Sequence, residues 1–309
     1  MYICHVKGTV IKTTGKRYTV KMVDGLFVQC RLKGKFRIKG IKSTNPIVVG
    51  DKVEVEQESE LWMIVKLHKR KNHILRKSVN LSKQTHIIAA NVDQAILMVT
   101  IQSPITTTGF IDRFLAAAQS YGIDVIIIFN KLDIYDKQMM QKQKQLRKMY
   151  EQIGYECIAI SVLHDDLTKV ITAMKDKTNV ISGHSGVGKS TLINKLHSKL
   201  NLATKEISDS HKQGKHATTF SHLHDLPFGG AIIDTPGIKG FGLVDIEKEE
   251  LGDYFREFLL RKKKCKFHNC IHLNELDCAV KSALQKGTIF ESRYVSYLGM
   301  LEEDTIYRQ

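Results

Sequence analysis

The sequence Gly183-His-Ser-Gly-Val-Gly-Lys189-Ser190 has the residue types and the spacing that phosphate binding needs. It follows a strand-like segment and precedes an amphipathic one, which is the context of a phosphate-binding loop. Its glycines allow backbone N–H groups to turn inward around phosphates, and Lys189 can place its charge on the β- and γ-phosphates. Ser190 offers a hydroxyl to Mg²⁺, and the helix N-terminus adds partial positive charge.

Asp234-Thr-Pro-Gly237 ends a short apolar segment downstream of this loop. A carboxylate at the end of a strand suits Mg²⁺ coordination through water, and the N–H of Gly237 can reach a γ-phosphate. By itself this motif is also typical of an ordinary turn. Its pairing with the phosphate loop favours a nucleotide site.

Asn130-Lys-Leu-Asp133 follows the apolar segment Val125–Phe129. The carboxylate of Asp133 can accept hydrogen bonds from both N1–H and the 2-amino group of guanine. Adenine lacks this donor pair and would leave a buried carboxylate unpaired, so the motif predicts strong selection for guanine. Ser161-Val162 stands where a second guanine-contacting loop would fall, although its signal is weak.

These motifs occur in an unusual order, with the guanine motif first, the phosphate loop second and Asp234–Gly237 last. In ordinary small GTPases the guanine motif comes last. The same sheet can still form if the chain is circularly permuted, because motif positions in space depend on the sheet and not on where the chain begins. We therefore expect a permuted GTPase domain.

Gly214–Thr219 lies where a switch threonine is expected, and Thr218 or Thr219 could ligate Mg²⁺ there. Ile238 follows Gly237 and cannot orient water, so another group must do so. His216 is the candidate for that role. A plain surface turn containing a surface histidine is the alternative.

Cys265, Cys270, His272 and Cys278 form a short C-terminal cluster. Three thiols and one imidazole make a complete tetrahedral Cys₃His zinc set, and four protein ligands leave no open position, so we expect one structural zinc per chain. His268 is a rival ligand, and free thiols are the alternative to a metal site. The adjacent Arg261–Lys264 is either a solvated face or a phosphate contact.

The elements around these motifs predict three parts. Residues 1 to about 70 contain five short strand-like segments separated by turn signals, which indicates a small β-barrel. Its stretch Arg31–Lys42 is basic, and with Phe36 it is either a solvated loop or a nucleic-acid groove. The run Lys66–Lys77 is interpreted as a linker. Alternating strands and helices from residue 86 predict a mostly parallel, doubly wound α/β sheet.

The last sixty or so residues contain the cysteine cluster, and helices are predicted on both sides of it, over Leu251–Lys264 and Cys278–Lys286. A helix is also predicted over Lys189–Leu200, directly after the phosphate loop.

The charge and the hydrophobic pattern of the chain indicate which classes of partner it can bind. The 309 residues include 47 Lys and Arg against 32 Asp and Glu, a net charge of +15, which favours a polyanion such as RNA or an anionic membrane. No long amphipathic apolar face accompanies the basic runs, and no apolar run nears the length of a membrane span, so we expect no membrane partner. Six cysteines without an export signal favour a reduced, cytoplasmic setting.

Taken together, these motifs resemble the RsgA or YjeQ family of circularly permuted GTPases that mature the small ribosomal subunit. The matching residues include Asn130–Asp133, Gly183–Thr191, Gly214–Thr219 and Asp234–Leu243 together with the cysteine–histidine set. Ala217 replaces the first of three threonines usual in the family. The resemblance implies an N-terminal OB-fold in residues 1–70, the permuted P-loop GTPase domain in 71–245 and a zinc-binding helical domain in 246–309.

The resemblance also implies GTP hydrolysis stimulated by the small (30S) subunit, a late maturation role, and rRNA binding through the two end domains by what we expect to be a monomer. It supports His216 as the water-positioning residue. The expected catalytic residues are Lys189, His216 and Thr218, and the expected Mg²⁺ ligands are Ser190, Thr218 and Asp234. The expected GTP-binding residues are Asn130, Lys131, Asp133, Gly183, His184, Ser185, Gly186, Val187, Gly188, Lys189, Ser190, Thr191, Asp234 and Gly237.

Rival functions stay open at this point. A non-catalytic RNA-binding module that uses nucleotide only as a structural ligand shares every motif except a working catalytic group. A permuted GTPase of the large subunit is disfavoured by the barrel and the zinc cluster, and an ATP-using kinase by Asp133. Gly186 stands where potassium-dependent relatives carry asparagine, which leaves potassium activation undecided.

Overall fold

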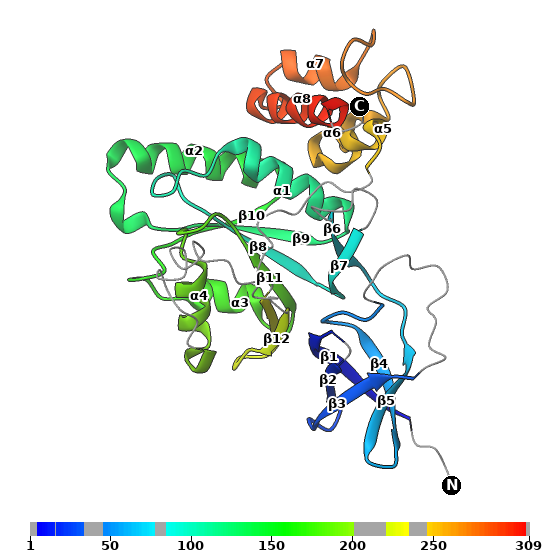
Figure 1. The fold of residues 1–309 in the computed structure, drawn as a ribbon. Helices are drawn as coiled ribbons and strands as arrows, with labels where there is room; N and C mark the ends of the chain where they lie inside the picture. The colour runs from blue at the N-terminus through cyan, green and yellow to red at the C-terminus, as the bar shows by residue number, and fades with distance from the viewer. Residues whose placement is uncertain are drawn as a thin grey trace. The chain divides into compact units, whose positions relative to one another are not determined.

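The computed structural model describes residues 5–15, 17–33, 46–77, 85–200, 221–234 and 246–306 (Figure 1). The chain divides into two compact units. The first contains Met1–Ala95, Leu167–Ile181 and Ser190–Gly240, and the second contains Ile96–Asp166, Ser182–Lys189 and Phe241–Gln309. Within the described residues, no helix is long and apolar enough to cross a lipid bilayer.

The first unit begins with a barrel. Strand β1 pairs antiparallel with β2 and β4, β2 with β3 and β4 with β5, while β3 and β5 run parallel, so the ring of strands closes. Alternate side chains point inward to a core that includes Val10, Val20, Val53, Val55 and Ile64. The barrel expected from the sequence is therefore present. Its strands are β1 (Val6–Thr14), β2 (Arg17–Met22), β3 (Phe27–Leu32), β4 (Lys52–Glu58) and β5 (Leu61–Leu67).

The interpretation of Lys66–Lys77 as a linker is wrong. Strand β6 (His73–Lys77) occupies its end and pairs antiparallel with β7 (Thr85–Ala90). Ile74 is fully buried, and the guanidinium of Arg70 forms two 2.7 Å hydrogen bonds to the buried carboxylate of Asp51. Basic residues dominate Lys66–Lys77, which suggests a linker. Its buried Ile74 and the pairing of Arg70 with Asp51 make the segment part of the folded structure.

The rest of the first unit contains part of the α/β arrangement. Strand β11 (Thr178–Ser182) runs parallel to β13 (Ala231–Asp234), which pairs antiparallel with β12 (His222–Asp225). β12 also meets β1 of the barrel, where His222 lies opposite Lys12. Two helices belong here, α3 (Thr168–Met174) and α4 (Lys189–Leu196). α4 ends earlier than the predicted Leu200, and a 3₁₀ turn follows over Ser198–Leu200.

The second unit holds the guanine motif. Strand β9 (Asp124–Phe129) lies between β8 (Gln94–Val99) and β10 (Glu156–Ala159), and β10 runs parallel to it. β9 is buried from Val125 onward, as expected for a central strand of a parallel sheet. The helices of this part are α1 (Thr108–Ser120) and α2 (Lys137–Ile153).

Short helices build the C-terminal part of the second unit around a core that includes Phe255, Phe258 and Tyr297. The single helix predicted over Leu251–Lys264 is wrong, because the chain divides into α5 (Lys248–Leu251), a 3₁₀ turn and α6 (Arg256–Lys262). Phe255 has extended backbone angles and separates the last two pieces. Helix α7 (Ala279–Gln285) matches its prediction, and α8 (Glu291–Ile306) ends the described chain.

Candidate functional site: a nucleotide site and a Cys₃His cluster

The phosphate loop connects β11 to α4, as its sequence predicts. Three of its glycines have positive φ: 141° at Gly183, 82° at Gly186 and 104° at Gly188. A Cβ at Gly183 would lie 2.3 Å from the carbonyl oxygen of Met98, and a Cβ at Gly188 would lie 2.4 Å from Nδ2 of Asn130. Backbone conformation therefore favours glycine at all three positions, and close packing also requires it at Gly183 and Gly188.

Lys189 begins α4 and turns back over its own loop. Its Nζ donates hydrogen bonds to the carbonyl oxygens of Gly183 at 2.7 Å and His184 at 2.6 Å. The loop thus holds the cation above the turn, where the family motif places the β- and γ-phosphates. A nucleotide would gain this charge by exchanging carbonyl partners for phosphate oxygens.

Asn130 joins the guanine motif to the phosphate loop. Its Nδ2 donates to the carbonyl oxygen of Val187 at 2.8 Å, and its Oδ1 accepts from the backbone N–H of Val162 at 2.9 Å. The side chain is 3% exposed, so neither bond is open to competition from water. One amide therefore fixes three segments that are far apart in the sequence.

Asp133 projects from a 3₁₀ turn, Leu132–Ile134, at the exposed mouth of this arrangement. The hydroxyl of Ser161 donates to its Oδ1 at 2.5 Å, and this bond holds the pKa of the Asp133 carboxyl below its usual value. The N–H of Ser161 is bonded in turn to Asp165 at 2.7 Å. The sequence gives only a weak signal for a guanine-contacting loop at Ser161–Val162. In the structure this segment contacts both polar ends of the guanine motif, Asn130 and Asp133.

Lys131 and Tyr135 set the base of the guanine loop. Lys131 has a left-handed backbone, with φ of 67°, and its Nζ donates to the carbonyl oxygen of Ser103. The hydroxyl of Tyr135 donates to the carbonyl oxygen of Asn130 and accepts from the N–H of Ile101, both at 2.7 Å. Sequence reasoning missed Tyr135, whose only signal was its position just after the motif.

The remaining predicted nucleotide residues fall into two groups. Ser190 and Thr191 lie in the first turn of α4, and Asp234 ends β13. β11 and β13 are parallel, with Val180 opposite Ile233, so their carboxyl ends emerge at the same edge of the sheet. His216, Thr218, Thr219, Gly237 and Ile238 lie outside the described residues, as does Phe36.

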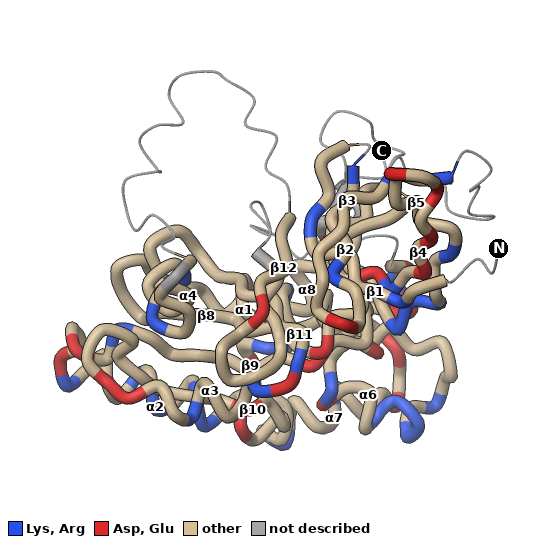
Figure 2. The backbone as a smooth tube through the Cα atoms, turned by 90° about the horizontal axis from the view of Figure 1, so that it is seen from below, with Lys and Arg blue, Asp and Glu red and all other residues tan. Residues whose placement is uncertain are grey.

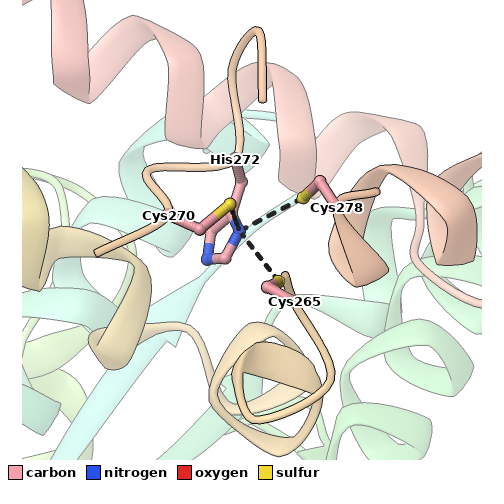
Figure 3. Close-up of side chains that lie close together, drawn as sticks. All are labelled: Cys265, Cys270, His272 and Cys278. Atoms are coloured by element: carbon pink, nitrogen blue, oxygen red, sulfur yellow. Dashed lines mark hydrogen bonds between the residues drawn. The ribbon is translucent and has the colours of Figure 1, made fainter. Parts of the chain in front are cut away.

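The C-terminal cluster brings together the four predicted metal ligands (Figure 3). From Nδ1 of His272, the sulfur atoms of Cys270, Cys278 and Cys265 lie at 3.3, 3.4 and 3.8 Å. Around a tetrahedral zinc with Zn–S near 2.3 Å and Zn–N near 2.0 Å, such atoms stand about 3.5 Å apart. The donor set therefore fits zinc, and the rival His268 is not part of it.

Neighbouring groups fix the backbone of this cluster. The carboxylate of Glu275 accepts from the N–H groups of Ile271 at 2.6 Å and Leu273 at 2.7 Å, and the Tyr294 hydroxyl donates to the carbonyl oxygen of His272 at 2.7 Å. A Cβ at Gly252 would lie 3.2 Å from Nε2 of His272. The imidazole is 1% exposed. Such closed surroundings suit a structural metal and leave no access for substrate.

Comparison with known sequences gives two family matches and many close relatives. The RsgA GTPase model matches residues 67–244, and the RsgA N-terminal domain model matches residues 7–61. A protein of Flavobacterium psychrophilum named small ribosomal subunit biogenesis GTPase RsgA is 54% identical over 307 residues, which cover 97% of this chain and 94% of that protein. A protein of the same name from Bacteroides fragilis is 51% identical over 96% of this chain and 97% of its own length.

Two solved structures are similar over nearly the whole chain. The crystal structure of YjeQ from Thermotoga maritima gives a TM-score of 0.80 at 33% identity and covers 97% of this chain and 98% of that one. YloQ, described as a circularly permuted GTPase, gives 0.77 at 31% identity and covers 97% and 95%. The predicted fold, including the permutation, is confirmed.

Proposed function

The chain belongs to the RsgA GTPase family and is a GTP hydrolase, and from this premise we propose that it acts on the small ribosomal subunit. Its hydrolysis of GTP to GDP and phosphate is stimulated by that subunit during late maturation. The relatives from Flavobacterium psychrophilum and Bacteroides fragilis are named small ribosomal subunit biogenesis GTPase, which supports the choice of subunit. The rest of the proposal concerns which residues perform the reaction and which bind the subunit.

The observation that carries the nucleotide assignment is the double hydrogen bonding of Asn130. Its amide joins the loop that would surround the phosphates to the loop that would read the base. Asp133, oriented by Ser161, then faces the position where N1–H and the 2-amino group of guanine would lie. A site built in this way selects guanine because adenine would leave the carboxylate without donors.

For the reaction itself, Lys189 would neutralise charge on the β- and γ-phosphates, and Gly237 would donate its N–H to the γ-phosphate. Ser190, Asp234 and Thr218 would hold Mg²⁺, which supplies further charge neutralisation when bound with GTP. His216 would orient the attacking water, because Ile238 cannot. Gly183, His184, Ser185, Gly186, Val187, Gly188, Thr191 and Lys131 complete the proposed GTP site.

For the two ends of the chain we propose separate roles in RNA binding. The barrel has its own core, and the two family models match residues 7–61 and 67–244, which supports domain limits at residues 1–70, 71–245 and 246–309. One zinc bound by Cys265, Cys270, His272 and Cys278 would stabilise the last domain. The net charge of +15 suits rRNA. We also propose that the protein is a cytoplasmic monomer without a membrane partner.

A hydrolysis assay with purified small subunits tests this function. Phosphate release is measured from GTP and from ATP, with subunits added or withheld. We expect phosphate release from GTP and not from ATP, and we expect the subunits to accelerate that release markedly. Equal use of both nucleotides would contradict the guanine site, and no release under any condition would leave the non-catalytic RNA-binding module as the better account.

A further inference from the structure

Helix α2 carries an exposed basic stripe that the nucleotide site does not use. The helix contains five basic residues (Lys137, Lys142, Lys144, Arg147 and Lys148), and Glu151 is its one acidic residue. Lys137, Gln141, Lys144 and Lys148 follow a spacing of 4, 3 and 4, which places them on one face. All four are exposed, whereas Gln143, Met149 and Tyr150 are buried. Lys and Arg recur along α2 in Figure 2.

The charges of this stripe destabilise the helix, whereas an ordinary surface helix would pair them with acidic residues. Lys144 and Lys148 are like charges at i and i+4, which repel, and Lys137 stands at the positive end of the helix dipole. Arg147 is paired with Glu151 at 2.7 Å. Lys137, Lys144 and Lys148 have no carboxylate partner among the parts of the chain that the structure describes. Glutamine stands where glutamate would relieve the repulsion.

We propose that this stripe is an additional RNA-binding surface, which contacts the phosphate backbone of small-subunit rRNA from within the GTPase domain. The inference rests on the proposed function. At about 1.5 Å of rise per residue, Lys137 and Lys148 stand roughly 16 Å apart along the axis, enough to follow several phosphates of one strand. Gln141 adds a neutral hydrogen-bond donor to phosphate and sugar. Because α2 begins soon after Asp133, RNA bound here lies beside the guanine loop.

Neutralising the stripe tests the proposal. Lys144→Gln with Lys148→Gln keeps helix propensity nearly constant and removes two charges. The matched control is Lys169→Gln with Lys175→Gln, two exposed lysines of α3 and its end that have acidic neighbours in the sequence. Binding of the full-length, zinc-loaded protein to purified small subunits is measured by sedimentation with a non-hydrolysable GTP analogue over a range of salt concentrations.

We expect the α2 variant to bind about tenfold more weakly, with the slope of log affinity against log salt reduced by about one to two. The control should match the wild type, and GTP hydrolysis without subunits should be the same in all three proteins. Equal affinity and slope for the wild type and the α2 variant would overturn this inference while leaving the function intact. Failure of the wild type itself to bind would overturn both. A reversal variant, Lys144→Glu with Lys148→Glu, should bind more weakly still.

A different observation supports a second inference, about the phosphate loop. The ring of Phe110 in α1 lies 4.0 Å from that of His184, centroid to centroid, with 32° between the planes. His184 is also the residue whose carbonyl oxygen accepts from Lys189. Phe110 is only half-buried, so its ring contributes little to the core. Its contact is with the first residues of the loop.

Helix α1 is firmly anchored on its other side. Asp112, fully buried, accepts from the guanidinium of Arg293 at 2.7 Å and from the Tyr150 hydroxyl at 2.9 Å. Arg293 also donates to Glu257 at 2.7 Å. Removing one partner of such a buried set is strongly destabilising. These buried bonds therefore tie the helix that carries Phe110 to α2 and α8.

We infer that Phe110 is a positioning residue for GTP, and that it acts through its tilted ring contact with His184, which fixes the start of the phosphate loop. Contacts between aromatic rings stabilise a site beyond the apolar area that they bury. Phe110→Ala should raise KM for GTP about fivefold with a smaller change in kcat, and Phe110→Tyr should restore KM. Phe114→Leu, in the buried core of the same helix, should lower the melting temperature without this change in KM.

The result that would overturn this assignment is a KM for Phe110→Ala equal to that of the wild type. A Phe110→Tyr protein as impaired as Phe110→Ala would also contradict a role for the ring contact. Phe110→Leu separates the ring contact from general apolar contact, because leucine fills much of the space without a ring. We expect its KM to stay near that of Phe110→Ala.

Discussion

The two binding regions of this chain are built on opposite principles. At the Cys₃His cluster, four side chains from one short segment converge within 4.8 Å of one another, and His272 is almost fully buried. At the nucleotide site, the phosphate loop offers mainly backbone groups, Lys189 is bonded to its own loop, and Asp133 is exposed. The first region is closed around its ligand, and the second is open.

This difference indicates how each ligand behaves. A ligand held by four side chains, three of them buried, exchanges slowly and serves as part of the fold. A ligand held by backbone groups and an exposed carboxylate can enter, react and leave. The comparison therefore predicts that damage to the cluster changes stability, whereas damage to the nucleotide site changes binding and rate.

The largest effect should come from Cys270→Ser. Losing one thiolate removes most of the zinc affinity, and structural zinc contributes on the order of 10 kcal/mol to small domains. We expect the variant to lack zinc by elemental analysis and to lose cooperative unfolding of its C-terminal part. His268→Gln is the matched control and should keep a full complement. Zinc retained by Cys270→Ser would contradict the ligand set.

Lys189→Ala should abolish productive nucleotide binding while leaving the melting temperature nearly unchanged. Truncating one partner of a buried charged hydrogen-bond pair costs several kcal/mol, so GTP affinity should fall a hundredfold or more. Calorimetric titration measures it. Lys195→Ala, in the last turn of the same helix, should bind GTP normally. If Lys189→Ala turned over GTP at the ordinary rate, the phosphate assignment would fail.

His216→Ala should change the rate of GTP hydrolysis without changing GTP affinity. Loss of a water-positioning group should slow hydrolysis about a hundredfold, with GTP affinity nearly intact. Single-turnover phosphate release and nucleotide titration on the same preparation measure both quantities. An unchanged rate would exclude His216 and would require another group to orient water.

Asn130→Ala should weaken GTP binding, by less than Lys189→Ala does. The truncation leaves the Val187 carbonyl and the Val162 N–H unpaired in a buried setting, at about 1–3 kcal/mol for each such group. We expect GTP affinity to fall roughly tenfold or more, and the guanine and phosphate loops to become more mobile in hydrogen exchange. Wild-type affinity would show that these loops hold their positions without this amide.

Much of the fold was predictable because its signals are local. The barrel strands, β9, α7 and the phosphate loop follow from alternation, helical spacing and glycines. The errors arose where long-range pairing decides the outcome. Strand β6 was hidden in a basic run because its pairing with β7 and the bond of Arg70 to Asp51 are not visible in local sequence. The helix predicted over Leu251–Lys264 is interrupted at Phe255, where the backbone is extended and the side chain is fully buried in the C-terminal core.

The candidate sites were predictable to a similar degree. Motifs gave the residues that we propose for nucleotide binding and the four side chains that lie together in the Cys₃His cluster. They could not give the residues that hold the motifs together, such as Tyr135, because such roles depend on geometry between distant segments. The value of Ser161 also became clear only from its contact with Asp133.

From the proposed action on the small subunit follows one central prediction, that the nucleotide in the open region controls how tightly the protein holds that subunit. Sedimentation of the zinc-loaded protein with purified small subunits measures this directly, with a non-hydrolysable GTP analogue in one sample and GDP in the other. We predict clearly tighter binding with the analogue, because loss of the γ-phosphate would release the switch segment that follows Asp234 and leads into the C-terminal domain. Equal affinity in the two samples would contradict the account.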